Sequence, residues 1–563
     1  MKITVNNSFI IEYSVNEPLP LRDILIDNGC LIPSPCGGKG NCGKCTVSVN
    51  GEAVKSCGYF IKCDEGDINV TVPVFFLNRQ NEFEKALPFG FASGQGESKN
   101  SKKQYIFLDI GSTALEMAKA DESGEITESI KCENPQCAYG ADVISRIEYC
   151  RRHGQHSLQK CLLDKINEML SLLLPGNEEE ISPCGDTATV SKGSEASSTG
   201  SEASSTSSAI SSVTSRIQSE KPDLLAAFSN ENSDLFVTGN TVMLHSFFGE
   251  DLTKMGVYPY TPSFLEGQGR RGEAMGLNKI NSVISFPCIA PFIGSDITTG
   301  IEMCPMPKTD EKFLFIDLGT NSEIALITSE RLYFTSAPAG PCFEGGNIKC
   351  GSAALPGAIC SFNKETGFCL IGENPAGRET CDKAAEHQSP AGICAFCNDE
   401  SHKAASKNPI GICLTGLIDI ISYLVKSGLV TPGGEMISKK FRLTSNIFVD
   451  REDIRSFQTA KSAIRAGIAI LLKRAGVTLG SVDRLFIAGA AGENLSIDSA
   501  VTAGLIPKEL ERKVTKVGNS ALRGLIKSAI TGEMKFNDFE KEYIDLSLDE
   551  DFGKIFIENM NFE

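Results

Sequence analysis

The chain has 563 residues, 41% of them hydrophobic, and about three to four domains are expected because one core rarely serves so long a chain. Its formal net charge of −17, from 54 basic and 71 acidic side chains, argues against nucleic acid as the main partner, since phosphate binding requires a basic face. It has no tryptophan and 21 cysteines, and cysteines this abundant in a chain without signs of secretion indicate a reducing, anaerobic cytoplasm.

The chain also lacks the marks of export or membrane insertion. Residues 1–15 do not contain the apolar core of a signal peptide. No segment approaches the roughly 18 uninterrupted apolar residues of a membrane-spanning helix. The best candidate, 418–430, is broken by Lys426. We therefore expect a cytoplasmic protein with no membrane partner.

Four cysteines close to the N-terminus have the spacing that a [2Fe–2S] cluster needs. The order is Cys36-x5-Cys42-x2-Cys45-x11-Cys57, so three thiolates come from one tight loop and the fourth from the following hairpin. The glycines between them allow the backbone to curl and to direct N–H groups at an anionic centre. We predict that these four cysteines bind a [2Fe–2S] cluster.

Two other interpretations of this cysteine pattern are weaker. A zinc site usually has two C-x2-C pairs or a pair with histidine, whereas this stretch has a single pair and no nearby histidine. A disulfide framework requires an oxidising compartment. Cys30 and Cys63 flank the loop as spectators, and Cys63 is the rival for the fourth ligand position.

The surrounding pattern predicts a β-grasp ferredoxin domain over 1–76. Apolar alternation predicts strands in 2–15 and 68–72, and apolar residues spaced by three and four predict a short helix in 21–29. Residues 46–54 have a hairpin pattern around an Asn-Gly pair, which favours a type I′ turn.

An internal repeat follows a polar, glycine-rich stretch at 77–104, which is typical of a linker or a small helical spacer. Residues 105–113 are an apolar strand that runs into Asp-x-Gly-Ser-Thr, and 313–321 have nearly the same pattern with Asp-x-Gly-Thr-Asn. The repeat predicts two related α/β halves, a middle domain over 105–302 and a C-terminal half over 303–563.

The two repeated loops predict a nucleotide site. A strand aspartate followed by glycine and hydroxyl residues can hold hydrated Mg²⁺ and let the backbone approach phosphates. A third apolar strand at 485–492 ends in small residues, and Gly489 and Gly492 leave room there for a nucleoside. The alternative is that all three are buried strands with tight turns. The residues predicted to cradle Mg²⁺ and phosphates are Asp109, Gly111, Ser112, Thr113, Asp317, Gly319, Thr320 and Asn321.

Two segments have the composition of insertions. Residues 182–219 are crowded with Ser, Thr, Gly and Ala and are predicted to be disordered. Residues 363–407 are polar and contain Cys381, Cys394 and Cys397 near two histidines. A zinc ion or a further cluster is one interpretation of these thiols. Loose surface thiols are the favoured one, because the surrounding sequence lacks apolar residues at regular spacing.

Several longer phrases are similar to those of one family. They are Asn134-Pro135-Gln136, Gly239-Asn240-Thr241, Gly294-Ser295-Asp296-Ile297, Asp317-Leu318-Gly319-Thr320-Asn321-Ser322-Glu323 and Gly518-Asn519-Ser520. In these phrases the chain resembles the reductive activators of corrinoid-dependent proteins, nearly end to end, with the two insertions as gaps. The resemblance implies an α+β and α/β multidomain fold. A β-grasp [2Fe–2S] ferredoxin domain is followed by a linker and a two-lobed actin-like (ribonuclease H-like) ATPase of the acetate/sugar kinase, heat-shock protein and actin superfamily.

The same resemblance implies ATP-dependent reduction of cob(II)amide to cob(I)amide on a corrinoid protein or a corrinoid-dependent methyltransferase. The electron would come from an upstream low-potential donor through the N-terminal cluster. The implied cofactors are the [2Fe–2S] cluster, ATP and Mg²⁺, and a homodimer is among the expected assemblies. Asp317 and Glu323 are the candidate catalytic residues, with Glu323 orienting the attacking water. Gly239, Asn240 and Thr241 are expected at the nucleotide.

Two alternative functions stay open at this point. One is an ATP-dependent activator of another low-potential enzyme, such as a 2-hydroxyacyl-CoA dehydratase, although a separate [2Fe–2S] domain disfavours it. The other is a non-enzymatic, nucleotide-gated redox sensor or assembly factor. Leu414-Thr415 and Ala490-Ala491 stand where the family usually has Gly-Ser and Gly-Phe, which affects nucleotide contacts and not the fold. His245 is expected to be a buried core residue.

Overall fold

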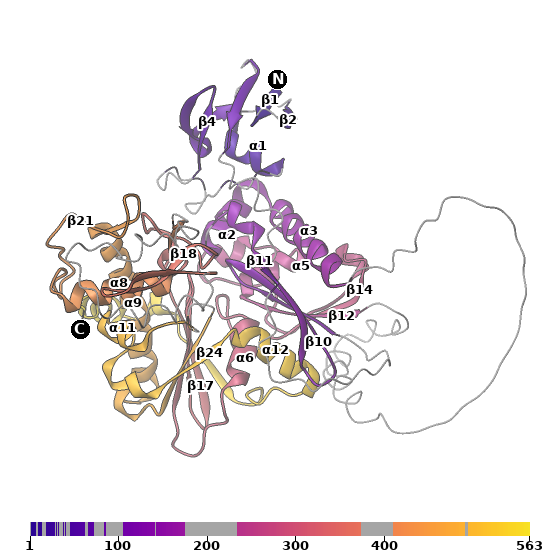
Figure 1. The fold of residues 1–563 in the computed structure, drawn as a ribbon. Coiled ribbons are helices and arrows are strands. Elements are labelled where there is room, and N and C mark those ends of the chain that lie inside the picture. Colours follow the sequence, from indigo (N-terminus) through magenta and orange to yellow (C-terminus); the bar gives the residue numbers. More distant parts are fainter. Residues whose placement is uncertain are drawn as a thin grey trace, which may run out of the picture.

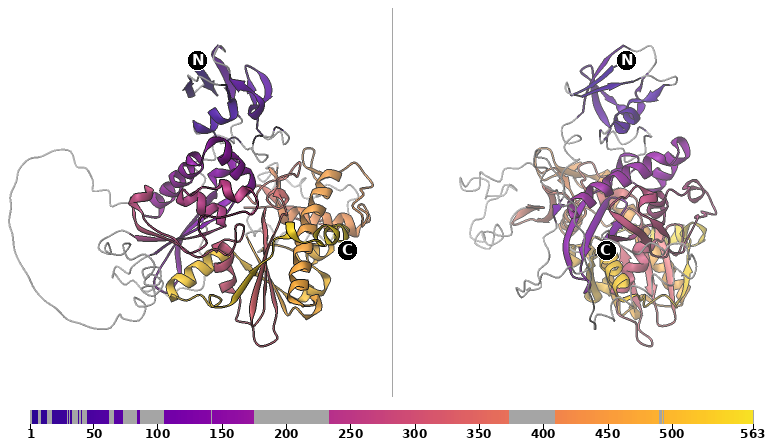
Figure 2. Two further views of the ribbon diagram at one scale, coloured as in Figure 1. Left: turned by 180° about the vertical axis from the view of Figure 1, so that it is seen from behind. Right: turned by 90° about the vertical axis from the view of Figure 1, so that its right-hand side faces the viewer.

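The computed structural model describes residues 2–6, 9–13, 18–28, 30, 32, 38, 40, 45–61, 66–72, 84–85, 105–140, 142–174, 233–372, 409–489, 492 and 494–562. Cys36 and Cys42, the predicted disordered insertion 182–219, and Cys381, Cys394 and Cys397 lie outside the described residues. A small N-terminal domain stands on the first of two larger halves, which lie side by side (Figures 1 and 2).

The N-terminal domain is built on a five-stranded sheet in the order β2-β1-β7-β4-β5, with β1 and β7 parallel and the other neighbours antiparallel. Alternate residues such as Ile3, Val47 and Val70 face α1 and form the core. The predicted β-grasp layout is therefore confirmed. The elements are β1 (Lys2–Val5), β2 (Phe9–Glu12), β3 (Leu19–Pro20), α1 (Leu21–Asp27), β4 (Thr46–Val49), β5 (Glu52–Lys55), η1 (Ser56–Gly58), β6 (Phe60–Ile61) and β7 (Ile68–Thr71).

The hairpin β4–β5 turns at the predicted Asn-Gly pair. Asn50 has φ 50° and Gly51 has φ 92°, and a type I′ turn requires positive φ at both central residues. This turn fixes the register in which Thr46 pairs with Lys55. The hairpin thereby returns the chain to Cys57 beside Cys45.

The first half contains a seven-stranded sheet in the order β13-β14-β12-β9-β10-β11-β8. β9, β10 and β11 form an antiparallel meander, and β12 and β14 run parallel to β9. The strands are β8 (Glu84–Lys85), β9 (Tyr105–Ile110), β10 (Ala114–Ala120), β11 (Ile126–Glu133), β12 (Ser233–Gly239), β13 (Gly269–Arg271) and β14 (Ile280–Ser285). The helices are α2 (Val143–His153), α3 (His156–Leu173), α5 (Thr241–Phe248) and α6 (Ser295–Gly300).

The second half repeats this arrangement in a six-stranded sheet of order β24-β23-β15-β16-β17-β25. Its meander is β15–β17, and β23 and β24 run parallel to β15. The prediction of two related halves is confirmed, with β9 and β15 in equivalent central positions. The strands are β15 (Phe313–Asp317), β16 (Ser322–Ile327), β17 (Arg331–Ala337), β23 (Arg484–Ala488), β24 (Val514–Gly518) and β25 (Glu540–Tyr543).

The helices of the second half and two small sheets complete the fold. The helices are α8 (Leu414–Lys426), α9 (Arg451–Ala475), α11 (Ile497–Thr502), α12 (Ser520–Thr531) and α13 (Phe552–Glu558). The small sheets contain β18 (Ala358–Asn363), β19 (Gly367–Leu370), β20 (Gly411–Ile412), β21 (Lys440–Arg442) and β22 (Phe448–Asp450). None of the helices in the described part of the chain is both long and apolar enough to cross a bilayer.

One helix of each half, α6 of the first and α12 of the second, packs on the sheet of the other half. Leu525 of α12 lies in a core with Phe107 and Phe236 of the first sheet, and Ile297 of α6 lies in a core with Phe315 of the second. Figure 1 shows α12, in yellow, beside the purple strand β10 of the first half. This exchange of helices joins the two halves through two shared hydrophobic cores.

Two segments expected to be irregular contain strands. Within the predicted linker 77–104, the described residues Glu84 and Lys85 form β8 and pair with β11. At the start of the predicted insertion 363–407, β19 pairs with β18 as a hairpin. Strands of two and four residues are too short to show an alternating pattern, which explains why the sequence did not indicate them.

Candidate functional site

Two of the four predicted cluster cysteines fall within the described residues, and the β4–β5 hairpin brings their chain segments together. Cys45 directly precedes β4, and Cys57 lies in η1 directly after β5. Ser56 donates its backbone N–H at 3.1 Å and its hydroxyl at 2.8 Å to the carbonyl of Cys45. Both cysteines are buried, and no cysteine of the described part forms a disulfide.

The described glycines of the cluster loop have the conformation that an iron–sulfur site requires. Gly38 has φ 86° and Gly40 has φ 75°, in the left-handed region that favours glycine. Lys55 extends from β5 and donates its Nζ to the carbonyl of Gly40 at 2.7 Å. Two buried thiols close to glycines of this conformation fit the donor set of a [2Fe–2S] cluster.

The first Asp-x-Gly-Ser-Thr loop connects β9 to β10 and is held from behind by two buried side chains. Asn134 donates its Nδ2 to the carbonyl of Gly111 at 2.7 Å and its N–H to the carbonyl of Thr113 at 2.8 Å. Arg146, fully buried in α2, donates to the carbonyl of Ser112. The carbonyls of Gly111, Ser112 and Thr113 thus all accept hydrogen bonds. Asn134 and Arg146 therefore hold this loop in its conformation.

The second loop, between β15 and β16, is held by η9 (Pro341–Glu344). Thr320 donates its hydroxyl and, at 3.4 Å, its N–H to the carboxylate of Glu344. The hydroxyl of Ser322 donates to the carbonyl of Gly319 at 3.1 Å and closes the turn. Both predicted loops are therefore preformed.

Carboxylates from both halves gather where the two loops meet. Asp109 lies directly opposite Glu116 in the first sheet, and Asp317 lies directly opposite Glu323 in the second. The equivalent register puts an acidic pair at the same place in each half. Asp296, in the first turn of α6, adds a fifth carboxylate near Asp109 and Asp317.

Burial and mutual repulsion raise the pKa values of Asp109, Asp296, Asp317 and Glu323. Burial, and then the charge of Glu116, raise the pKa of Asp109 to about 7. Burial, and then Glu344, raise the pKa of Asp317 to about 6. The pKa values of Asp296 and Glu323 also lie well above their usual range, first because of burial and then because of the neighbouring aspartates. Concentrated negative charge of this kind is a site for a cation.

Two asparagines that cap helices connect the acidic residues across the molecule. Asn240, the N-cap of α5 in the first half, donates its Nδ2 to Glu323 of the second half at 3.3 Å. Asn519, the N-cap of α12 in the second half, donates its Nδ2 to Asp109 and to Glu116 of the first half, both at 3.0 Å. Each half thus contributes an uncharged donor to the other half's carboxylates.

The glycine turn after β23 lies against the same acidic centre. Gly489 has φ 89°, and a Cβ at this position would lie 2.7 Å from the carboxylate of Asp317. The N–H of Gly492 donates to the carbonyl of Gly489 at 3.0 Å and closes the turn. The structure therefore brings Gly489 next to the second loop, in a cradle that only glycine leaves open.

A divalent cation fits this centre best through water. The described residues contain no set of three or more cysteine, histidine or acidic side chains arranged to ligate a metal directly. Mg²⁺ usually keeps several of its waters and takes one or two carboxylates together with phosphates. The buried hydroxyl of Thr113 has no hydrogen-bond partner within the described structure, and a phosphate or water oxygen would satisfy it.

Of the three residues predicted at 239–241, Asn240 alone reaches the acidic centre. Gly239 is buried against Ile110 of β9, and Thr241 donates its hydroxyl to the carbonyl of Ala290 at 2.7 Å. His245 of α5 is buried as expected, its Nδ1 lying 2.7 Å from the carbonyl of Thr241. Its Nε2 accepts two backbone N–H groups, so the imidazole is a neutral structural residue.

The sequence-based prediction missed several residues of this centre. Glu116, Asp296, Glu344 and Asn519 all lie in or beside the acidic group, and none was named as a site residue. Asp296 and Asn519 stand in phrases shared with the family, and that was the available signal. Glu116 follows Asp109 by seven residues, and Glu323 follows Asp317 by six. Aligning the two repeats would therefore have identified Glu116 as the counterpart of Glu323.

Three family models together match most of the chain. The 2Fe-2S iron-sulfur cluster binding domain matches residues 3–69. The RACo middle region matches 106–185 and 205–309. The C-terminal domain of RACo, the ASKHA domain, matches 311–563.

Two curated relatives and one solved structure are similar to the chain. The corrinoid activation enzyme RamQ of Eubacterium limosum is 24% identical over 465 residues, which are 76% of this chain and 64% of the relative. The [Co(II) methylated amine-specific corrinoid protein] reductase of Methanosarcina barkeri is 29% identical over 245 residues, 43% of each protein. The chain thus spans less than two thirds of either relative.

The solved structure is that of a reductive activator for a corrinoid, iron–sulfur protein. It is 22% identical, with a TM-score of 0.59, and the match covers 100% of this chain and 98% of the other. At this identity the likeness concerns the fold, which is shared from the N-terminal domain through both halves.

Proposed function

Because the chain belongs to the family that joins a [2Fe–2S] domain to the RACo middle region and the RACo C-terminal ASKHA domain, we propose that it is an ATP-dependent reductive activator. Its substrate is the Co(II) corrinoid of a partner corrinoid protein or methyltransferase, which it reduces to Co(I). The printed names of the two curated relatives, a corrinoid activation enzyme and a Co(II) corrinoid protein reductase, support this proposal.

One observation carries the proposal most directly. A single chain combines a thiol-lined ferredoxin loop with an acidic centre built from two related halves. The first is suited to carry one electron at a time, and the second to hold a metal-bound nucleotide. A protein that only transfers electrons would not need the second, and a kinase would not need the first.

In this proposal Cys36, Cys42, Cys45 and Cys57 hold the [2Fe–2S] cluster, which supplies one-electron transfer when bound. The Ser56 contacts to the Cys45 carbonyl keep the two hairpin thiols at a fixed separation. Burial of both thiols excludes water from that side of the site. A buried, preorganised ligand set lowers the reorganisation that accompanies electron transfer.

The nucleotide would lie between the two halves. Asp109 and Asp317 orient the water shell of Mg²⁺, and the loops Gly111–Ser112–Thr113 and Gly319–Thr320–Asn321 surround the phosphates. Glu323, held by Asn240 at 3.3 Å, orients the attacking water and accepts its proton, since its raised pKa suits a general base. Gly489 and Gly492 leave space for the adenosine part of ATP.

ATP is needed because Co(I) corrinoids are strong reductants, so the electron moves uphill from an ordinary donor. Each ~59 mV of uphill one-electron transfer lowers the equilibrium tenfold, or about 1.4 kcal/mol. Closure of two halves on a nucleotide can change their hold on the partner. Tighter binding of the reduced partner than of the oxidised one then shifts the equilibrium towards Co(I).

The test is the reduction of a Co(II) corrinoid protein by the reconstituted chain with and without MgATP, followed by the visible spectrum of Co(I). We expect Asp317→Ala to abolish the effect of ATP while leaving the absorption of the iron–sulfur centre unchanged. Asp498→Ala, at an exposed aspartate paired with Lys426, is the matched control and should behave like the natural protein. Equal reduction with and without ATP would remove the coupling from the proposal.

A further inference from the structure

Arg22, in the first turn of α1, is a buried cation in an otherwise apolar helix face. It is 4% exposed, and its Nε donates to the carboxylate of Asp23 at 2.6 Å, with an additional ion pair from Nη2. Its Nη1 has no hydrogen-bond partner in the described structure, and neither has Oδ2 of Asp23. A buried guanidinium N–H without an acceptor is costly, so its retention requires an explanation.

The guanidinium lies directly on the cluster loop. A Cβ on Gly38 would lie 2.8 Å from Cζ and 3.1 Å from Nη2 of Arg22, and Nη1 is closer still. Only a glycine therefore allows the guanidinium to approach the loop at this point. Gly38 stands two residues after Cys36 in the sequence.

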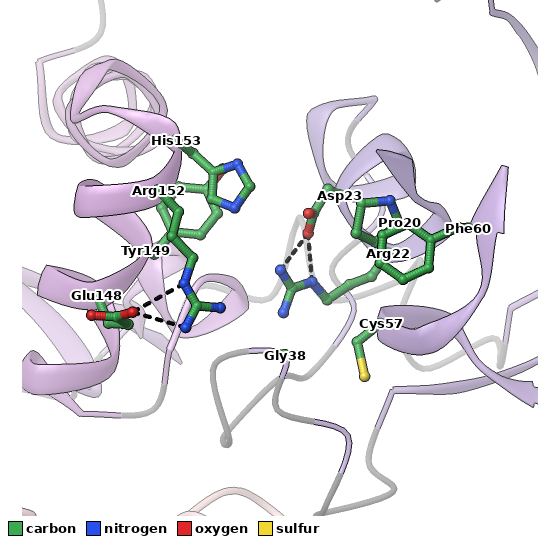
Figure 3. Close-up of a pocket in the computed structure, with 10 residues that line it drawn as sticks. All are labelled: Pro20, Arg22, Asp23, Gly38, Cys57, Phe60, Glu148, Tyr149, Arg152 and His153. Atoms are coloured by element: carbon green, nitrogen blue, oxygen red, sulfur yellow. Dashed lines mark hydrogen bonds and ion pairs between the residues drawn. The ribbon is translucent and has the colours of Figure 1, made fainter. Parts of the chain in front are cut away.

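Cys57 lies on the same side of the domain as this contact. Arg22, Gly38 and Cys57 line one cavity of about 120 Å³ between the N-terminal domain and α2. Figure 3 shows Arg22 extending from α1 into the space beside Cys57, with Arg152 of α2 opposite. Arg152 is itself a cation with donors only, and it is paired with Glu148 at 2.8 Å, so it cannot supply the acceptor that Arg22 lacks.

We propose that Arg22 is a positioning residue for the [2Fe–2S] centre. Its Nη1–H donates to the anionic sulfur side of the bound centre, and the Arg22–Asp23 pair sets the reduction potential of that centre. The inference rests on the cluster assignment in the proposed function. It identifies which charged side chains of this chain act on the cluster, beyond the four thiols.

The sign of the effect follows from charge. Reduction adds one negative charge to the centre, so a nearby cation and a hydrogen bond stabilise the reduced state and raise the potential. The carboxylate of Asp23 acts in the opposite direction and partly offsets Arg22. Removing either member of the pair therefore moves the potential, and the two removals move it in opposite directions.

The experiment is a spectroelectrochemical titration of the full-length, anaerobically reconstituted protein, followed by visible absorption and by electron paramagnetic resonance of the reduced centre. Arg22→Gln should lower the potential by a shift equivalent to at least tenfold in the one-electron equilibrium, about 59 mV. Arg22→Lys, which keeps the charge, should restore most of it. Asp23→Asn should raise the potential. Arg151→Gln, at an exposed arginine of α2 outside the cavity, is the control and should leave the potential unchanged.

An unchanged potential in a cluster-loaded Arg22→Gln protein would overturn the inference. If that variant does not retain the centre, Asp23→Asn still decides, because a potential that falls or stays the same contradicts the proposed charge pair. The proposed function fails in a different way, namely when the natural chain itself holds no two-iron chromophore.

Discussion

Where α6 and α12 cross, the geometry predicts whether one substitution stabilises or destabilises the fold. Gly524 of α12 packs against α6 so closely that a Cβ there would lie 2.6 Å from the carbonyl carbon of Thr299 and nearer still to its oxygen. The hydroxyl of Thr299 donates to the carbonyl of Ala521 at 3.1 Å across the same crossing. The two atoms that the Cβ would meet, the carbonyl carbon and oxygen of Thr299, belong to the backbone and cannot rotate away as a side chain would.

Gly524→Ala should therefore destabilise the protein, although alanine is the better helix former. Carbon atoms in contact lie about 3.5–4 Å apart, so the helices must separate by roughly 1 Å. Overpacking of this kind costs about 1–3 kcal/mol, and the gain in helix propensity offsets roughly 1 kcal/mol. Because rigid backbone lies on both sides, the cost falls at the upper end of this range, about 3 kcal/mol, and the net loss is about 2 kcal/mol.

The matched control is Gly553→Ala in α13, where nothing lies within 4 Å of the added Cβ. This variant gains helix propensity alone and should be stabilised by up to ~1 kcal/mol. The assay is urea-induced unfolding of both variants and the natural protein, followed by circular dichroism. Opposite shifts of the midpoint are expected. A Gly524→Ala protein as stable as the natural one would refute the close crossing of α6 and α12.

Three further predictions concern buried polar groups. Burial lowers the pKa of His245, so its neutral form stabilises the fold above the unfolded value of about 6.5, and stability should fall as pH drops below it. His245→Gln should remove this contribution, measured as the difference between the pH-dependent thermal unfolding of the variant and of the natural protein, and identical pH dependences would contradict the role. Asn519→Ser keeps a helix cap but loses the donor to two carboxylates, so nucleotide binding measured by calorimetry should weaken while the fold is retained; unaltered binding would argue against this link. Lys461, buried in α9, donates to the backbone of the C-terminal tail, so Lys461→Met should cost about 1–3 kcal/mol in urea unfolding, whereas exposed Lys508→Met should cost nothing measurable.

Much of the fold follows from local sequence patterns. The Asn-Gly pair predicts the β4–β5 hairpin because few other residues adopt positive φ twice in succession. The repeated Asp-x-Gly phrases predict two equivalent strands, and Asp109 and Asp317 do occupy equivalent positions at the acidic centre. These features are short-range or repeated, so a single sequence reveals them.

The parts that escaped prediction depend on contacts between distant segments. Ile297 of α6 and the apolar face of α12 indicate burial but not which sheet covers them, and each helix lies on the other half's sheet. Asn519 meets Asp109 across 410 positions of the chain, a pairing that no local spacing encodes. Arg22 stands in an amphipathic helix where a charged residue normally faces solvent, so its burial against the cluster loop was not expected.

The account depends most on the electron leaving the iron–sulfur centre for the corrinoid under the control of ATP. The most direct test is a single-turnover, stopped-flow experiment in which the pre-reduced chain is mixed anaerobically with a Co(II) corrinoid protein, with and without MgATP. We expect the bleached absorption of the centre to return at the same rate and in the same amount as Co(I) appears, and only when MgATP is present. Reoxidation of the centre without formation of Co(I), or an equal yield of Co(I) in the absence of nucleotide, would contradict it.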